Sequence, residues 1–222
     1  MPTLTYLGHS GFLVTDGTHT LAIDPFLTGN PLATTAADDL APTAIALTHG
    51  HDDHVGDTVS IARRTGATVY GAFELCGYLG ESGVDACEPM NPGGQVETPF
   101  GWIALTQAFH SSSTGQGRYL GQPCGVVVHI GGRTIYHCGD TALFGDMALI
   151  GELYTPDVAC VPIGDRFTMG PRLATRAAEL IGAPVAIPIH YDTWPPIAQD
   201  PTTFAPQGVT VRVMRPGESW SM

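Results

Sequence analysis

The stretch Thr48-His49-Gly50-His51-Asp52-Asp53-His54 contains four side chains that can bind a metal ion: His49, His51, Asp53 and His54. Residues 43–47, just before it, form an apolar run typical of a buried strand. Residues 55–66, just after it, carry apolar side chains at helical spacing and end in a glycine of the C-cap type. The four side chains are therefore expected on the loop between the carboxyl end of a strand and the amino end of a helix. Ligands bind in that crevice in α/β folds.

The spacing of these four residues suits two metal ions. If the chain is still extended after the strand, His49 and His51 point the same way, because side chains alternate with a period of two. Asp53 and His54 are adjacent, so they diverge as the helix begins. One pair can hold one ion and the other pair a second. The alternative is a polar turn with solvated histidines, but four potential ligands in this order favour a metal site.

Length and composition predict one α/β domain over residues 1–222. The chain is 43% hydrophobic, which is enough for a substantial core. Its 28 glycines and 18 prolines follow no Gly-X-Y period and indicate many short elements joined by tight turns.

The net charge of -12 argues against a nucleic-acid partner, because that field repels a phosphate backbone. The nearest approach to a basic run is Arg63-Arg64. Five cysteines without a CxxC spacing argue against a disulfide framework or a zinc ribbon, and Cys124, Cys138 and Cys160 lie in apolar strand-like runs that predict small buried side chains. The amino terminus has no signal-peptide pattern, and no apolar run approaches the ~18 residues of a membrane span. These features predict a cytoplasmic protein that does not enter a membrane.

Alternation, helical spacing and turn residues predict the order of elements. The expected strands are 4–7, 11–14, 20–23, 43–47, 67–71, 95–97, 102–109, 125–130, 133–138, 157–163, 183–189 and 209–213. The expected helices are 55–66, 73–79 and 172–181.

Seven potential ligands fall at or immediately after the ends of these strands: His49, His51, Asp53, His54, His110, Asp140 and His190. Nitrogen and oxygen donors of this kind suit two divalent ions, with zinc favoured and manganese or iron as alternatives, and one aspartate can bridge them. A hydroxide shared by such ions would be nucleophilic near neutral pH, because metal binding lowers the pKa of water to about 7. The predicted reaction class is metal-assisted hydrolysis.

The sequence resembles the metallo-β-lactamase fold hydrolases, whose His-x-His-x-Asp-His motif residues 49–54 match in full. Over nearly the whole chain it is similar to a branch of bacterial metal-dependent hydrolases related to the L-ascorbate 6-phosphate lactonases. The segments that carry this likeness are 6–10, 48–57, 107–112, 139–141, 164–165, 167–171 and 189–191. An aspartate, Asp192, stands where that branch is expected to have asparagine, which concerns local pocket contacts only.

The resemblance implies a four-layer αββα sandwich and a division of the ligands between two ions. The first ion would be held by His49, His51 and His110. The second would be held by Asp53, His54 and His190. Asp140 would bridge them, and Asp53, His54 and Asp140 are the predicted catalytic residues. Asp24 would support the site through hydrogen bonds.

The motif says little about the substrate, since one fold serves many reactions. We expect a small anionic ester, lactone or phosphoester. The candidate contacts are His9, Arg118, Arg166 and Thr168, each with a purely structural role as the alternative. The 111–118 segment, which follows His110, is either a lid or an ordinary surface loop. The sequence leaves the oligomeric state open, including a homo-oligomer.

Three other functions compete with a small-molecule hydrolase. A metal-dependent nuclease or phosphodiesterase shares the motif, but the chain has no basic arm. In a redox protein of the flavodiiron type, the position that His51 occupies in this chain is usually a carboxylate, and a flavin domain follows; His51 therefore argues against this function. A binding module could hold metal without turnover.

Overall fold

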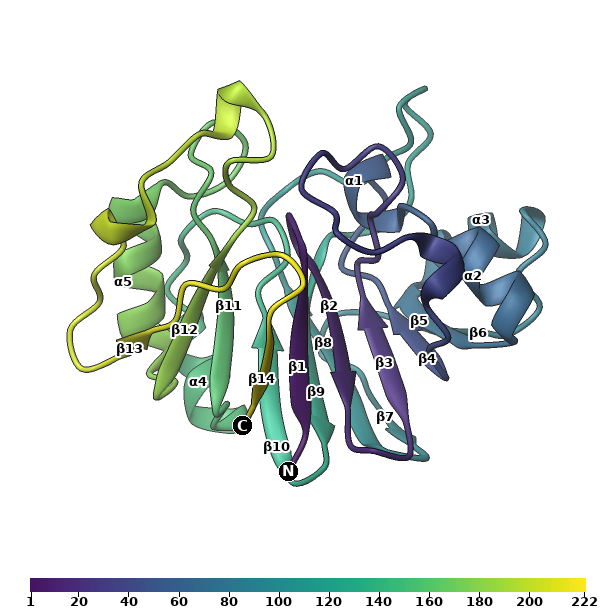
Figure 1. Cartoon of the computed structure of the whole chain (residues 1–222), viewed down its shortest axis with the longest axis horizontal. Helices are drawn as coiled ribbons and strands as arrows, with labels where there is room; N and C mark the ends of the chain where they lie inside the picture. The colour runs from purple at the N-terminus through teal and green to yellow at the C-terminus, as the bar shows by residue number, and fades with distance from the viewer.

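Two seven-stranded sheets face each other in the computed structural model, which describes residues 1–222 (Figure 1). The first sheet has the order β14 (Ser219–Ser221), β1 (Thr3–Gly8), β2 (Gly11–Thr15), β3 (Thr20–Ile23), β4 (Ala44–Ala46), β5 (Thr68–Ala72) and β6 (Cys87–Met90). The second has the order β13 (Thr210–Val211), β12 (Val185–Ile189), β11 (Val158–Pro162), β10 (Arg133–His137), β9 (Cys124–Ile130), β8 (Gly101–Gln107) and β7 (Gln95–Thr98).

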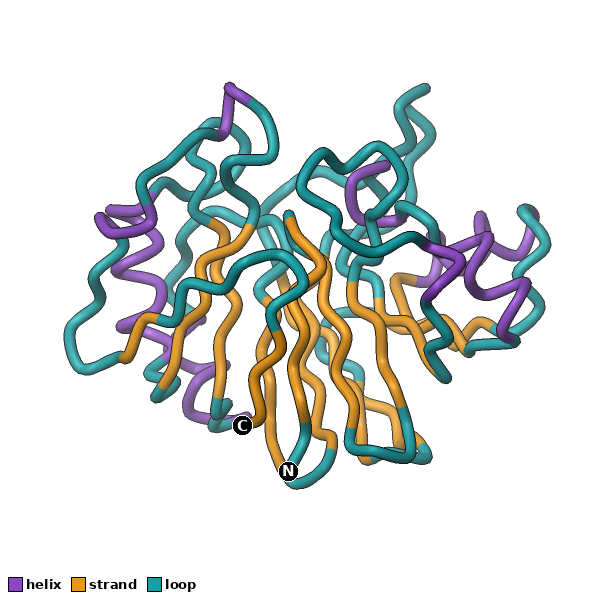
Figure 2. The backbone as a smooth tube through the Cα atoms, viewed as in Figure 1, coloured by secondary structure: helices purple, strands orange, loops and turns teal.

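Helices lie on the outer sides of the two sheets (Figure 2). Those that follow strands of the first sheet are α1 (Asp52–Val55), α2 (Thr58–Thr65) and α3 (Phe73–Glu81). Those beside the second sheet are α4 (Met147–Tyr154) and α5 (Pro171–Ile181). Short 3-10 turns cover Ala37–Asp39, Pro195–Ile197 and Pro201–Thr203. The expected four-layer αββα sandwich is therefore confirmed. No helix is both long enough and apolar enough to cross a membrane.

The core has two layers, and β9 contributes to both. Val126, Val128 and Ile130 face the cluster between the two sheets. Val127 faces the cluster that packs the second sheet against α4 and α5. A strand buried on both faces reads as a continuous apolar run, because each successive side chain enters a different apolar layer.

The helix α5 packs through small side chains at helical spacing. Ala174, Ala177 and Ala178 are buried against the second sheet together with Ile181. At Gly151 of α4, an added Cβ would lie 2.0 Å from the Ile181 carbonyl oxygen. The two helices therefore approach more closely than any side chain at residue 151 would permit.

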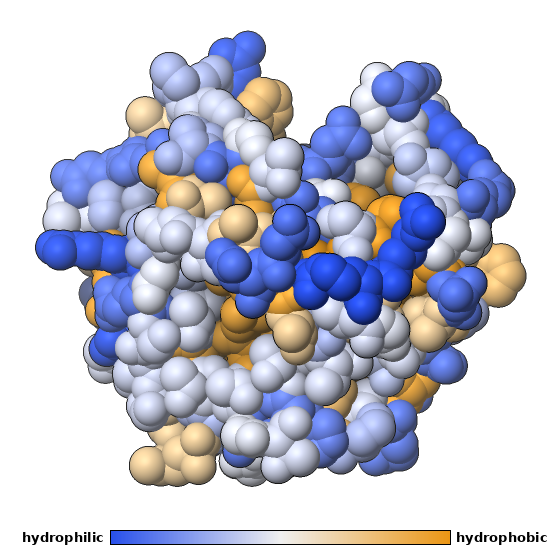
Figure 3. All heavy atoms as spheres, turned by 45° about the vertical axis from the view of Figure 1, so that its right-hand side comes forward, coloured by the Kyte–Doolittle hydropathy of each residue, from blue (hydrophilic) through white to orange (hydrophobic).

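Strand direction brings several strand ends to one edge of the molecule. In the second sheet β10, β11 and β12 are parallel, and β8 runs with them because both β8 and β10 are antiparallel to β9. In the first sheet β3, β4 and β5 are parallel. The loops after these strands gather at the end opposite the two chain termini (Figure 1). Turned about the vertical axis, that end shows a notch between two projecting groups of atoms (Figure 3).

Several expected elements differ from the observed ones. The helix expected over 55–66 is observed as α2, Thr58–Thr65, and a separate short helix, α1, covers Asp52–Val55, so Asp53 and His54 lie on this helix rather than on the expected loop. A Cβ at Gly56 would lie 2.6 Å from the Phe26 backbone, so the chain turns where that loop presses against it. The second expected helix does not stop at Gly80 but continues to Glu81. The strand expected over 209–213 shrinks to Thr210–Val211.

Besides α1, three helices or strands were not predicted: α4, β6 and β14. The sequence of α4, MALIGELY, is apolar on most sides and has a glycine inside, so it lacks a clear amphipathic stripe. Strand β6 contains Pro89, and a proline argues against a strand because it has no N–H to donate to the neighbouring strand. Strand β14 has only three residues, with serines at both ends.

Candidate metal centre

The loops at the strand ends bring all seven predicted ligands together. Residues 49–54 follow β4, while His110 follows β8, Asp140 follows β10 and His190 follows β12. Their nitrogen and oxygen atoms form three overlapping groups, each within 4.8 Å: His49, His51 and His110; His49, His54 and Asp140; and His9, Asp53, His54 and His190. Four of the strand-end loops, from both sheets, thus meet in one cluster.

The first group, which we call the three-histidine cluster, is His49, His51 and His110. His49 Nε2 lies 2.9 Å from His51 Nδ1. On its other side, His49 Nδ1 lies 3.0 Å from the Thr48 hydroxyl, which itself donates to an Asp24 carboxylate oxygen at 2.7 Å. Because that hydroxyl has already used its proton, His49 Nδ1 must donate to it. The lone pair of His49 Nε2 then faces the cluster.

Asp53, His54 and His190 form what we call the Asp53 cluster. His54 Nδ1 is 2.7 Å from Asp24 Oδ2, and Asp24 also accepts from the Thr48 backbone N–H at 2.9 Å. This arrangement keeps the proton on His54 Nδ1 and turns Nε2 toward the site, as carboxylates do for metal-binding histidines. Asp24 and His54 are completely buried, so the orientation is fixed away from water.

Asp140 joins the two clusters. Its carboxylate oxygens lie 3.4 Å from His54 Nε2, 3.4 Å from His110 Nε2 and 3.0 Å from His190 Nε2. A tetrahedral zinc ion bound at about 2.1 Å sets its ligand atoms about 3.4 Å apart. The observed separations of 3.0–3.4 Å between Asp140 and each of these histidines are therefore close to those of two ligand atoms that share an ion.

The clusters differ in charge. Burial lowers the pKa of His49, His51 and His110, so these imidazoles are neutral, which is the form that binds a metal. In the Asp53 cluster burial also acts to lower the pKa of His190, but the Asp140 carboxylate outweighs it and raises that pKa to about 9. The pKa of His54 is raised against burial in the same way, mainly by Asp140 and Asp24.

Two buried atoms at the junction of the clusters have no hydrogen-bond partner: His54 Nε2 and Asp140 Oδ1. Buried polar atoms without a partner are rare, because leaving one unsatisfied costs about 1–3 kcal/mol. A divalent cation between them would satisfy both. The donor set, its spacing and these two atoms therefore fit bound divalent ions.

Backbone strain is concentrated at this end of the molecule. His9, Asp24 and His190 have φ angles of 56°, 43° and 55°, in the left-handed region that side chains other than glycine rarely adopt. Such residues persist where the surrounding structure holds them and are frequent at active sites. Gly50 reflects a different constraint, because a Cβ there would lie 2.5 Å from the Leu120 side chain.

Leu120 belongs to a segment that folds over the motif. A bridge between Ser113 and Tyr119 and a hydrogen bond from the Leu120 N–H to the Ser112 carbonyl close it into a hairpin-like turn. The Ser112 hydroxyl accepts from the Gly50 N–H at 3.1 Å. The 111–118 segment is thus hydrogen-bonded to the motif, and its movement as a lid stays a prediction.

Three of the four predicted substrate contacts lie outside the groups of clustered ligands. Arg118 makes two bonds to Glu81, at 2.6 and 2.7 Å. The Arg166 guanidinium stacks over Phe167, and the Thr168 hydroxyl donates to the Met169 carbonyl. Substrate contact by these residues stays a prediction, and the Glu81 pair occupies the guanidinium of Arg118.

The fourth, His9, lies inside the Asp53 cluster. It is completely buried, with Nε2 3.1 Å from Asp53 Oδ2 and Nδ1 2.7 Å from the Thr193 hydroxyl. The sequence carried a signal for this placement, because His9 follows a strand end as the seven ligands do. The sequence around Thr193 carried no such signal.

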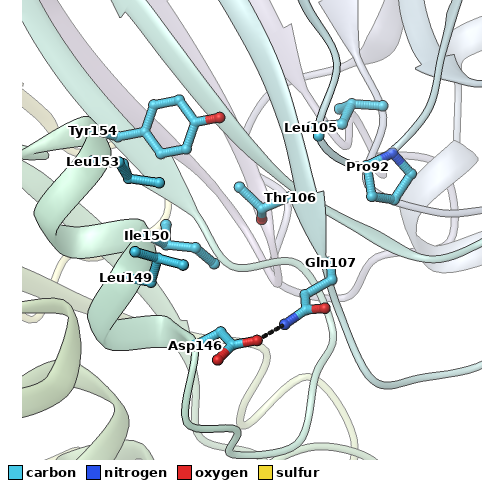
Figure 4. A pocket seen from close by; sticks show the side chains of 10 residues that line it. Pro92, Leu105, Thr106, Gln107, Asp146, Leu149, Ile150, Leu153 and Tyr154 are labelled. Carbon is cyan, nitrogen blue, oxygen red and sulfur yellow. Dashed lines mark hydrogen bonds between the residues drawn. The ribbon is translucent and has the colours of Figure 1, made fainter.

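A groove of about 320 Å³ between α4 and β8 is separate from this centre. Leu149, Leu153 and Tyr154 line one side, and Gln107 and Asp146 are hydrogen-bonded at 3.0 Å across its end (Figure 4). It shares no residue with the clustered ligands.

Comparison with known proteins agrees with this architecture. The family model described as the beta-lactamase superfamily domain matches residues 19–191. A protein from Shouchella clausii named a UPF0173 metal-dependent hydrolase is 49% identical, over 97% of this chain and 98% of its own. One of the same name from Geobacillus thermodenitrificans is 51% identical, with the same coverage. The structure of a metallo hydrolase from Ignicoccus hospitalis superposes with a TM-score of 0.89 at 38% identity, covering 100% of this chain and 99% of that one.

The sandwich with ligands at its strand ends is thus the fold of the metallo-β-lactamase superfamily, to which this chain belongs as a metal-dependent hydrolase of the UPF0173 family.

Proposed function

We propose that the protein is a dinuclear hydrolase that acts on a small anionic ester, lactone or phosphoester in the cytoplasm. Zinc is the favoured metal, with manganese or iron as alternatives. The observation that carries the proposal is the pair of ligand clusters joined by Asp140, whose oxygens lie within 3.4 Å of histidines from both. A single ion would leave one of these clusters without a function.

Each group has a distinct task in this proposal. The three-histidine cluster holds one ion, the Asp53 cluster holds the other, and Asp140 lies between them. Thr48 and Asp24 keep the protons of His49 and His54 on the nitrogens that face away from the ions. Divalent ions in such a site act as Lewis acids and lower the pKa of water to about 7.

Charge supports a small anionic substrate. With both ions present, two dications outweigh the three carboxylates of the centre, Asp24, Asp53 and Asp140, so the centre attracts an anion. The protein as a whole carries a net charge of -12, which repels a long polyanion along the rest of its path. A compact anion that fits within one Debye length, roughly 10 Å, interacts mainly with the electrostatic field of the metal centre.

Metal analysis and a substrate screen test the proposal together. Protein purified without added metal should contain two equivalents, and both His51→Ala and His54→Ala should retain about one. A screen of lactones, phosphodiesters and thioesters should find an activity that both variants lose. The matched control is His129→Ala, which removes a histidine outside the clusters and should keep both the metal and the activity.

Three outcomes contradict the proposal. Less than one equivalent of metal in the wild-type protein would contradict the proposed two-metal centre. Unchanged activity in His51→Ala would show that the three-histidine cluster takes no part in the reaction. A full metal complement without turnover of any compound in the panel would favour a binding module instead.

A further inference from the structure

The ring of His9 is held from both sides, and this determines where its proton lies. Its Nδ1 is 2.7 Å from the Thr193 hydroxyl oxygen, and its Nε2 is 3.1 Å from Asp53 Oδ2. The other acceptor within reach of the Thr193 hydroxyl is the Tyr191 carbonyl, at the much longer distance of 3.5 Å. Since hydrogen bonds from hydroxyl groups normally measure 2.5–3.0 Å, the Thr193 proton belongs on the His9 side.

If Thr193 donates to Nδ1, that nitrogen has no proton of its own. The single ring proton of His9 is then on Nε2 and points at the Asp53 carboxylate, which can only accept. A nitrogen that carries a proton cannot at the same time bind a metal ion. His9 therefore differs from His54 and His190, although all three lie in the same group.

The position of His9 is rigid. Its backbone carbonyl accepts from the His190 N–H and from the Tyr6 hydroxyl, each at 2.8 Å. Its ring packs beside those of His190 and Trp194, at centroid distances of 4.2 and 5.1 Å. The left-handed φ of 56° shows that these contacts hold a conformation the isolated residue would avoid. A donor held this firmly fixes the carboxylate that it contacts.

We propose that His9 is a positioning residue that donates Nε2–H to Asp53 Oδ2 and so holds this oxygen toward His190 Nε2 and His54 Nε2, which lie 3.7 and 3.9 Å from it, and that Thr193 enforces this tautomer. The inference rests on the proposed dinuclear centre. It replaces substrate contact as the role of His9. Partners that orient metal ligands in this way typically change metal affinity by 10–100-fold when they are removed.

Zinc titration of metal-free protein, by competition with a chromophoric chelator, measures the effect on affinity. His9→Phe keeps a ring of similar shape without a donor and should weaken the second binding step by about 10–100-fold. His9→Gln, which offers an amide N–H, should restore part of that loss. Thr193→Val should weaken the same step by less than His9→Phe does, because the ring can still adopt the required tautomer.

The chain contains a matched control for this pair. His129 Nδ1 lies 3.1 Å from the Thr134 hydroxyl, and His129 belongs to none of the ligand clusters. His129→Phe and Thr134→Val should leave both zinc affinities unchanged. Thr193→Val keeps His9 in place, so it remains available as the test variant in the zinc titration if His9→Phe fails to fold.

Long-range 1H–15N spectra of the imidazoles give a second readout that does not depend on activity. The His9 signals, identified by their loss in His9→Gln, should show the proton on Nε2 in both metal-free and zinc-loaded protein. A proton on Nδ1 in the zinc-loaded protein would identify His9 as a ligand and overturn the proposal. So would an unchanged second binding step in both His9→Phe and Thr193→Val. Wild-type protein that binds no second zinc ion would instead refute the dinuclear centre itself.

Discussion

The three-histidine cluster and the Asp53 cluster face each other across Asp140 but are built differently. The first has only neutral imidazoles, and its His51 is partly exposed. The second contains a carboxylate, and its His54 and His190 are almost completely buried. The difference teaches that charge, more than burial, separates the two clusters, because each contains both fully buried and partly exposed side chains.

The largest expected effect comes from removing the group that both clusters share. Asp140→Ala leaves His54 and His190 buried without their main negative partner, and loss of one member of a buried pair costs about 3–5 kcal/mol. The free energy of unfolding of the metal-free variant, from urea titration, should fall by about that amount. Metal binding should weaken in both clusters.

Asp157→Ala is the control for Asp140→Ala. Asp157 pairs with Arg133 at 2.7 Å, but that pair is partly exposed. Exposed pairs contribute about 1 kcal/mol or less. Equal losses in the free energy of unfolding of the two variants would show that Asp140 stabilises the protein no more than an exposed ion pair does.

Metal removal should have the next largest effect, because the ligands come from both sheets. An ion present at 100 times its dissociation constant stabilises the folded state by about 2.7 kcal/mol. Chelation should therefore lower the Tm of the wild-type protein. In His51→Ala, which keeps only the Asp53 cluster intact, the shift should be about half as large. A Tm that does not respond to chelation would show that the clusters do not link the sheets.

The smallest expected effect separates the two clusters directly. Thr48→Val removes the acceptor of the His49 Nδ1 proton, at 3.0 Å, but leaves His54 bonded to Asp24. Zinc affinity of the three-histidine cluster should fall by about 10-fold, the lower end of the usual range for such partners, and that of the Asp53 cluster by less. Thr134→Val is the control. Equal losses in both steps of a zinc titration would show that the clusters behave as one unit.

The sequence predicted the position of the seven ligands well because strand ends are local features. An apolar run followed by histidine or aspartate, as at 183–189 and His190, marks the edge of a parallel sheet. The parallel order of β10, β11 and β12 then brings such ends together. Their roles as ligands stay predictions until metal is measured.

Contacts between distant segments could not be predicted in this way. Thr193 lies 184 residues from His9, and nothing in the spacing of either indicates a shared hydrogen bond. Arg118 looked free to bind an anion, yet Glu81, 37 residues away, occupies it. The helix α4 was missed because tertiary packing, including the close contact at Gly151, stabilises a segment with no amphipathic stripe.

The left-handed backbone at His9, Asp24 and His190 has a consequence for engineering heat resistance. Each such residue costs of order 1–3 kcal/mol that glycine would largely recover. Glycine would also remove the side chain to which the proposed centre assigns the positioning or binding of metal. Durability and turnover therefore compete at these three positions, and stabilising substitutions belong on the far side of the sandwich, around the two chain termini.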